Sequence, residues 1–294
     1  MDRTFDLVLF GATGFTGRLV AEHVAARAPA GLRWALAGRN QGKLDDIRRA
    51  LGLAELPLVD ADVSRPESLD ALARSTRVVC TTVGPYALHG SDLVAACAAA
   101  GTHYCDLTGE PQWVRRMADL HHEQARSSGA RIVNCCGYDC IPADLGLLVL
   151  QDHAIARHGR PASRVTHYIG KVRGGTSGGT VSSALQIFAE AEADPAIRAI
   201  LEEPYSLNPP GERQGPDGPD RRGLSWDDAV GAWTAPSVMA LIDNRLVRRS
   251  HALRGFPYGR DFRWEEVMTL PKGPVGAAVG AAVATGSALA PLAL

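Results

Sequence analysis

A glycine-rich stretch near the N-terminus constrains the fold of this chain more than any other feature. The apolar run at residues 5–10 leads directly into three glycines spaced three apart, Gly11, Gly14 and Gly17, and then into a helical pattern. In a parallel sheet the first strand must turn sharply into its helix. Glycine permits that turn and lets a pyrophosphate approach the backbone. The stretch therefore predicts a dinucleotide site, with an ordinary glycine turn as the alternative.

The helix that follows the glycines directs unpaired amides and the positive end of its dipole toward a bound phosphate. The predicted phosphate-binding loop consists of Gly11, Ala12, Thr13, Gly14, Phe15, Thr16 and Gly17.

The end of the second predicted strand, residues 32–37, indicates which cofactor is bound. Arg39 follows that strand, and no acidic residue stands beside it. Enzymes that prefer NAD place an acid here for the ribose hydroxyls, whereas an arginine pairs with the extra phosphate of NADP. The sequence therefore predicts NADP (NADPH), bound by Arg39 with Asn40 and Lys43 beside it. A solvated arginine at a strand end is the alternative.

Further apolar runs alternate with helical patterns. A third strand ends near Asp62, which either accepts a hydrogen bond from the adenine amino group or caps the next helix. The fourth strand is a continuous apolar run, as expected when helices cover both faces of a parallel sheet. Its end is predicted to line the nicotinamide half of the site through Val83, Gly84, Pro85 and Tyr86.

Two more strands are predicted, one within residues 103–110 and one at 131–136. Strands that alternate with helices in this way predict an α/β fold with a doubly wound parallel sheet of the Rossmann type.

Length and charge limit the classes of partner. The chain has 294 residues, enough for two domains, and its net charge of -1 argues against nucleic acid as a partner. The N-terminus has no small-residue cleavage site, and six cysteines lie mostly in apolar runs, as is typical of free thiols in the cytoplasm. Cys135, Cys136 and Cys140 lack a second pair of ligands at metal spacing, so no metal site is predicted.

The second half predicts a domain of mixed helices and strands. We place the nucleotide domain at residues 1–148, an α+β substrate or dimerisation domain at 149–270, and an apolar tail rich in alanine and glycine at 271–294. Proline and glycine at 204–224 predict a mobile surface loop. The helix predicted at 181–193 offers its amino end to an anion or a carbonyl, unless the glycines before it form an ordinary turn.

The tail raises the question of membrane contact. Residues 275–294 carry no charge and just reach the length needed to cross a bilayer. Alanine and glycine dominate them and give a weak transfer energy, although Gly276 and Gly280 have the spacing of a helix-dimer motif. Weak membrane association and packing under another part of the protein are the alternatives.

Motifs along nearly the whole chain resemble the saccharopine dehydrogenase-like oxidoreductases. In the first half these are GATGFTG, AGR at the second strand, VGPY, DLTGE and GYDCIPADLG. In the second half they are GGTSGGTVSS, PSVMALIDNRLVRRSHAL and FPYGRDFRWEEVM, which most resemble the trans-acting enoyl reductase branch.

That resemblance implies an NADPH-dependent oxidoreductase of lipid metabolism that reduces an unsaturated acyl substrate for polyketide synthases. Members of the branch extend beyond the point that corresponds to Leu294. A non-catalytic NADP-binding protein, associated with lipid or with a partner, is therefore the alternative, and a homodimer is left open.

Candidate proton donors follow the carboxyl ends of strands, where the ligands of such sheets bind. Tyr138 is the first choice, with Asp139 next to it and Tyr104 on the fifth strand. An aromatic wedged between the domains is the alternative for Tyr138. Glu110 is predicted to cap the helix that Pro111 opens.

Overall fold

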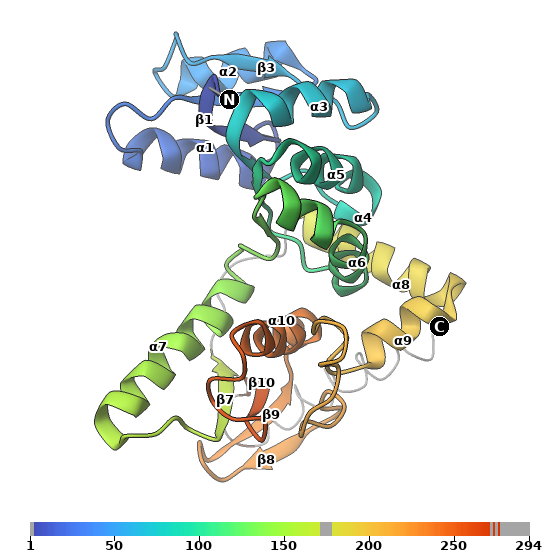
Figure 1. Ribbon diagram of the computed structural model, residues 1–294. Helices are drawn as coiled ribbons and strands as arrows, with labels where there is room; N and C mark the ends of the chain where they lie inside the picture. The colour runs from blue at the N-terminus through green and yellow to red at the C-terminus, as the bar shows by residue number, and fades with distance from the viewer. Residues whose placement is uncertain (1–2, 171–177, 271–272, 274–275, 277–294) are drawn as a thin grey trace. The chain divides into compact units, whose positions relative to one another are not determined.

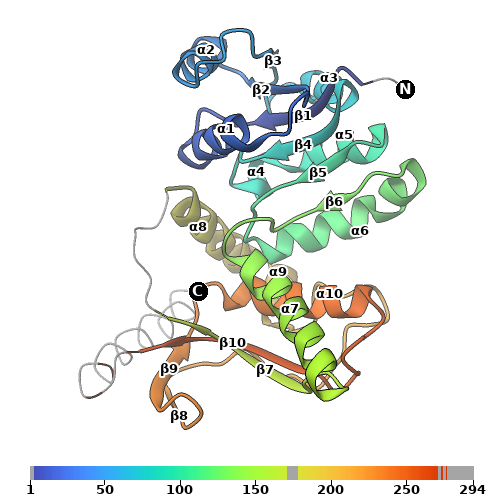
Figure 2. The ribbon, with the colours of Figure 1, turned by 90° about the vertical axis from the view of Figure 1, so that its left-hand side faces the viewer.

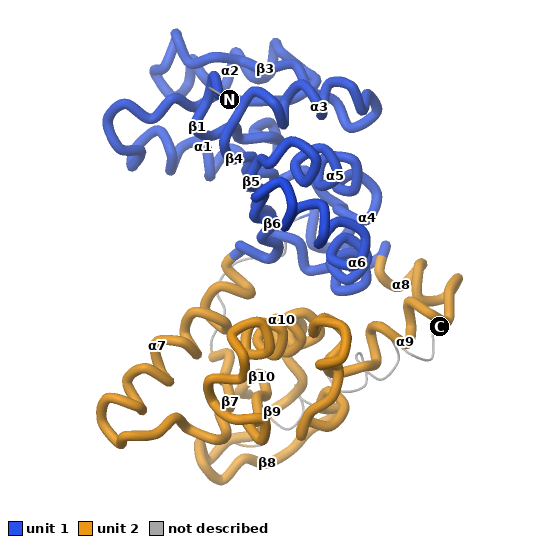
Figure 3. The backbone as a smooth tube through the Cα atoms, viewed as in Figure 1, with its two compact units in different colours: residues 1–137, 177–186 blue, residues 138–176, 187–294 orange. Residues whose placement is uncertain are grey.

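The computed structural model describes residues 3–170 and 178–270, together with Gly273 and Gly276. The chain divides into two compact units, which Figure 3 shows in different colours. Unit 1 is drawn from residues 1–137 and 177–186, and unit 2 from residues 138–176 and 187–294. We describe each unit by itself.

Unit 1 contains one parallel sheet with the strand order β3-β2-β1-β4-β5-β6. The strands are β1 (Phe5–Phe10), β2 (Trp34–Gly38), β3 (Leu58–Asp60), β4 (Thr76–Thr81), β5 (His103–Cys105) and β6 (Ile132–Val133). The helices are α1 (Phe15–Arg27), α2 (Gln41–Ala50), α3 (Pro66–Ser75), α4 (Tyr86–His89), α5 (Ser91–Ala100) and α6 (Pro111–Ser128). This order confirms the predicted doubly wound Rossmann-type sheet (Figures 1 and 2).

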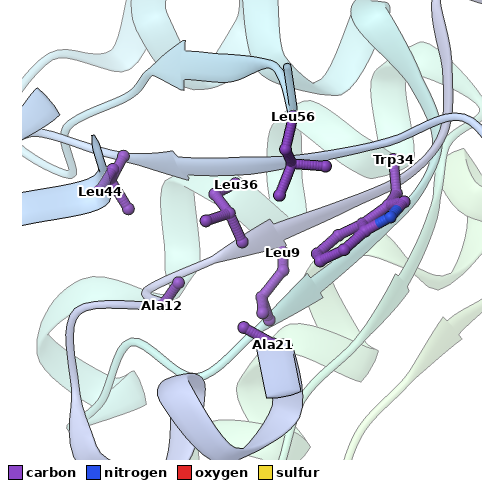
Figure 4. Close-up of a cluster of buried hydrophobic side chains, with 7 residues drawn as sticks. All are labelled: Leu9, Ala12, Ala21, Trp34, Leu36, Leu44 and Leu56. Carbon is purple, nitrogen blue, oxygen red and sulfur yellow. The ribbon is translucent and has the colours of Figure 1, made fainter. Parts of the chain in front are cut away.

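Helices cover both faces of the sheet, as expected for a parallel sheet whose central strands are rich in apolar residues. On one face, Leu9 of β1 and Leu36 of β2 are fully buried and pair in register. Ala21 of α1 and Leu44 of α2 pack onto them in the same cluster (Figure 4). On the other side α5 packs between α3 and α6. The core thus fixes β1 at the centre of the sheet.

Unit 2 contains a mixed sheet with the order β7-β10-β9-β8, in which only β7 and β10 run parallel. Its strands are β7 (Arg164–Ile169), β8 (Ser225–Asp227), β9 (Ala232–Pro236) and β10 (Arg263–Thr269). Its helices are α7 (Cys140–His158), α9 (Pro195–Glu202) and α10 (Ala240–Leu253), and α8 (Gly178–Ala193) is shared between the units. A second domain of mixed helices and strands is therefore confirmed.

A compact apolar core holds unit 2 together. Leu147 of α7 and Val247 of α10 pack with Phe262 and with Trp264 of β10. Since α7 is continuous from residue 140 to 158, residue 148, where we predicted the domain boundary, lies inside a helix.

Residues 204–224, for which the sequence predicts a mobile loop, are tied to unit 2 by buried and charged side chains. Tyr205 is 7% exposed, and its hydroxyl donates to the Asp217 carboxylate at 3.0 Å. Arg248 of α10 donates to the same carboxylate at 2.8 Å, and Arg245 donates to Asp220 at 2.6 Å. Both arginines are buried, so these ion pairs fix the loop against α10.

Within the described part of the chain, no helix combines the length and the apolar character that a membrane span requires. The apolar segment 275–294 lies outside the described residues, apart from Gly276.

Candidate functional site

The three glycines of the N-terminal stretch have different structural roles. Gly11 has a φ of 99°, and a β-carbon there would lie 2.7 Å from a methyl group of Val83 and 2.9 Å from the Thr82 hydroxyl. A β-carbon on Gly17 would overlap the carbonyl oxygen of Gly11. Both glycines are therefore required by the fold, because they allow the turn after β1 to pack on α1 and on the segment after β4.

Gly14 is not required by the fold in this way. It is the N-cap residue of α1, with extended backbone at φ -82° and ψ 165°, and a β-carbon on it would make only an ordinary contact at 3.5 Å. No side chain caps α1 among the described residues, and its first turn contains no acid. The free amides at this helix start and the open space at Gly14 fit a phosphate group.

The other loop residues divide between core and surface. Ala12 is fully buried in the cluster of Figure 4, whereas the Phe15 side chain is 76% exposed. Thr13 is exposed and Thr16 is half-buried. The loop therefore presents its backbone and the side chains of Thr13 and Phe15 to solvent, while Ala12 anchors it.

This loop lies where the strand order of the sheet reverses. β2 and β3 follow on one side of β1, whereas β4, β5 and β6 lie on the other side. The carboxyl ends of β1 and β4 continue into Gly11 and into Val83, Gly84 and Pro85. Ligands of open parallel sheets bind in the crevice outside such a point. Pro85 is buried, while Gly84 is exposed at this edge.

Arg39 directly follows β2 and is exposed, as is Lys43 in the first turn of α2. Asn40, which the sequence placed with them as a cofactor ligand, caps α2, since its side chain accepts a hydrogen bond from the Lys43 amide at 2.9 Å. An asparagine immediately before a helical pattern is a typical sequence signature of this capping role. Asn40 thereby fixes the backbone on which Arg39 stands.

Asp62 does not cap α3, so that alternative is wrong. The N-cap position belongs to Arg65, which makes no side-chain cap. The Asp62 carboxylate instead accepts hydrogen bonds from the Ser64 amide at 3.0 Å and from the Ser64 hydroxyl at 2.9 Å. These bonds, together with the positive charge of Arg39, lower the pKa of Asp62. An ionised carboxylate therefore lies near Arg39 at this edge.

Glu110 also has a role that differs from the predicted one. It is the N-cap residue of α6, as predicted, but its side chain does not cap that helix. Its carboxylate instead accepts hydrogen bonds from the amides of Tyr86 at 2.9 Å and Ala87 at 2.7 Å, at the start of α4. The Ser183 hydroxyl donates to the same carboxylate at 2.9 Å. Glu110 is fully buried, so it holds the segment after β4 in place from within the unit.

The Tyr86 side chain lies in the core. It is 4% exposed, its ring packs on Trp113, and its hydroxyl donates to the Thr81 carbonyl at 3.2 Å. Burial raises the pKa of Tyr86. The buried Tyr86 side chain therefore packs under the segment after β4 and stabilises it.

Tyr104 belongs to a buried network around Asp106. The Tyr104 hydroxyl donates to the Asp106 carboxylate at 2.9 Å, and the amides of Thr108 and Cys135 donate to it at 3.1 and 2.9 Å. The Asn134 side chain adds a fourth donor at 2.7 Å. Asp106 is 2% exposed, and burial raises its pKa to about 6. The network joins the segments that follow β5 and β6, and it occupies the hydroxyl of Tyr104.

Tyr138 and Asp139 follow this network in the chain. The Tyr138 side chain is 87% exposed. Asp139 lies at the start of α7, and desolvation, with a contribution from the negative charge of Glu266, raises its pKa. Of the three predicted proton donors, only Tyr138 and Asp139 are open to solvent.

Within residues 3–170 and 178–270, no three histidine, cysteine or acidic side chains are arranged to hold a metal ion.

Comparison with known proteins identifies the family. Residues 7–133 match the saccharopine dehydrogenase NADP binding domain. The chain is 45% identical to a Mycobacterium tuberculosis protein that is provisionally named a trans-acting enoyl reductase, over 96% of this chain and 70% of that one. This chain belongs to the trans-acting enoyl reductase family.

Other relatives agree with that assignment. The trans-acting enoyl reductase of Mycobacterium leprae is 40% identical over 97% of this chain and 71% of its own length. The trans-acting enoyl reductase of Mycobacterium bovis is 41% identical over 96% of this chain and 69% of its own. The matched NADP binding domain spans all but the first residues of the six-stranded sheet, so the predicted cofactor class is confirmed.

Substitution of the glycines separates their roles. We expect Gly17→Ala to destabilise unit 1 by about 3 kcal/mol, because its β-carbon would overlap the Gly11 carbonyl. Gly14→Ala should cost only about 1 kcal/mol or less, since its β-carbon has room and the loss is limited to the poorer N-cap preference of alanine. Chemical denaturation followed by circular dichroism measures both. Equal stability of the two variants would contradict the packing described for Gly17.

Asp106 should make the stability of unit 1 depend on pH. Its pKa rises from 3.8 to about 6 on folding, so the folded state retains the proton to higher pH than the unfolded state. The contribution of Asp106 to the free energy of unfolding is complete below the unfolded pKa and is lost as the pH rises through 6. The free energy of unfolding should fall by about 3 kcal/mol over this range. Denaturation between pH 4 and 7 should show this loss in the native chain and in the exposed control Asp70→Asn. If Asp106→Asn lost the same amount of stability over this pH range, a group other than Asp106 would be responsible for the loss.

Proposed function

We propose that this protein is an NADPH-dependent reductase that reduces the carbon–carbon double bond of an unsaturated acyl substrate. The observation that carries the proposal is the uncapped start of α1 at the point where the strand order reverses, with exposed Arg39 and no acid at the end of β2. The names of the 40–45% identical relatives support the reaction type.

The proposed cofactor contacts follow from the geometry of this edge. The amides of the loop from Gly11 to Gly17 bind the pyrophosphate, and Gly14 lets it approach. Arg39 and Lys43 bind the additional phosphate, because both are exposed cations beside the second strand. The Asp62 carboxylate accepts a hydrogen bond from the adenine amino group.

The nicotinamide half lies along Val83, Gly84 and Pro85 in this proposal. Tyr86 contributes by holding that segment, since its side chain is buried. NADPH, when bound there, supplies the hydride.

Reduction also needs a proton at the carbon that gains negative charge after hydride arrives. We assign the donation of that proton to Tyr138, whose side chain is 87% exposed. Asp139, with its raised pKa, is the second candidate. Tyr104 is less suited, because it is 1% exposed and its hydroxyl is bonded to Asp106. It is better placed to position the segments after β5 and β6.

Cofactor preference tests the role of Arg39. We expect Arg39→Gln to weaken NADPH binding about 10- to 100-fold, because a charge-assisted hydrogen bond to the phosphate is worth about 1.5–3 kcal/mol. NADH affinity should change little, since NADH lacks that phosphate. Arg27→Gln removes the same charge from the exposed end of α1 and serves as the control. Fluorescence titration measures all four affinities. Equal losses for NADPH and NADH in Arg39→Gln would contradict the assignment.

Turnover tests the reaction itself. NADPH consumption with 2-enoyl thioesters of several chain lengths is expected to be chain-length dependent and to yield the saturated thioester. Tyr138→Phe should lower kcat about 100-fold or more while the NADPH affinity stays unchanged. Tight NADPH binding without consumption of any enoyl thioester would favour the alternative of a non-catalytic NADP-binding protein.

A further inference from the structure

Two cysteines lie side by side in the sheet of unit 1. Cys80 of β4 and Cys105 of β5 are partners in the parallel register, so their side chains lie on the same face of the sheet. Neither is fully buried, and their thiols share a hydrogen bond. The sequence does not reveal this contact, because it depends on the pairing of two strands.

The spacing of the two strands permits a covalent bond between these cysteines. Neighbouring strands are about 4.8 Å apart. Disulfides form when the Cα atoms are separated by about 4.4–6.8 Å. The paired register therefore places Cys80 and Cys105 within the separation at which a disulfide can form.

The hydrogen bond between the thiols gives them different reactivity. Cys105 donates to the Cys80 sulfur, which lowers the pKa of Cys80 and raises the pKa of Cys105. Desolvation by burial, with further contributions from Cys136 and Asp106, opposes the lowering of the Cys80 pKa without reversing it. A thiolate is the reactive form of cysteine, so Cys80 is the nucleophile of the pair.

We propose that Cys80 and Cys105 are a redox-active pair, which a peroxide converts into a reversible disulfide between β4 and β5. The Cys80 thiolate attacks one peroxide oxygen, the O–O bond breaks, and Cys80 becomes a sulfenic acid while the other oxygen leaves as water after protonation. The Cys105 sulfur then attacks the Cys80 sulfur, and the S–O bond breaks with loss of a second water. The two thiols lose two electrons and hydrogen peroxide gains them.

The pair is placed to affect the cofactor site. Cys80 directly precedes Thr81, whose hydroxyl accepts from the Val83 amide at 3.2 Å. The next hydroxyl, that of Thr82, donates to the Gly11 carbonyl at 3.2 Å. A shift of Cys80 toward β5 therefore reaches the segment after β4 and the glycine loop. We expect the disulfide to lower NADPH affinity several-fold. This effect rests on the proposed function, whereas disulfide formation does not.

Mass spectrometry of the peroxide-treated full chain tests the bond. A protease that cuts before aspartate separates Cys80 from Cys105 at Asp92, and separates Cys136 from both at Asp106 and Asp119. We expect a Cys80–Cys105 linkage that a dithiol reductant removes. Persistence of both free thiols at peroxide concentrations that oxidise exposed Cys136, or a linkage from Cys80 to Cys136, would overturn the proposal.

Variants provide the controls. Cys97, on the same fragment as Cys105, is fully buried, so Cys97→Ser should keep the linkage. Cys80→Ser and Cys105→Ser should abolish it, with folding checked by circular dichroism. NADPH titration of the oxidised native chain should show weaker binding that the reductant restores. Unchanged NADPH affinity in a chain shown to carry the linkage would refute the effect on the cofactor site, and it would leave the reductase activity to be judged from turnover.

Discussion

The close packing of the turn after β1 on the segment after β4 is the constraint on which unit 1 depends. No β-carbon fits at Gly11 or Gly17, because Val83, Thr82 and the Gly11 carbonyl occupy that space. The contact joins β1 and β4 at the point where the strand order reverses, and it leaves the start of α1 facing outward. Gly14, which has no such internal neighbours, remains open for a ligand.

Two buried carboxylates complete this edge of the sheet. Glu110 accepts from the first amides of α4 and so fixes the segment after β4. Asp106 accepts from four donors and joins the segments after β5 and β6. Because a buried acceptor without donors is costly, each network specifies one arrangement of its loops. The residues around the proposed cofactor are therefore supported by side chains that do not touch it.

The parts of this architecture that depend on local sequence were predictable. Glycine spacing predicted the turn and the loop, and the apolar run of the fourth strand predicted a sheet that helices cover on both faces. Roles that depend on partners far away in the sequence could not be predicted. Glu110 acts on an amide 24 residues away, and the pairing of Cys80 with Cys105 requires the strand register. Asn40 had a local capping signature, but its position next to Arg39 favoured a cofactor role in our prediction.

The central claim is that NADPH binds at the start of α1 and along the segment after β4. Hydrogen exchange of the backbone amides, with and without saturating NADPH, tests it most directly. We predict slower exchange at the amides of Phe15, Thr16 and Gly17 and at those of Val83 and Gly84, because the bound phosphates and nicotinamide would shield them. Unchanged exchange at both segments, under conditions where NADPH binding is demonstrated, would contradict the account.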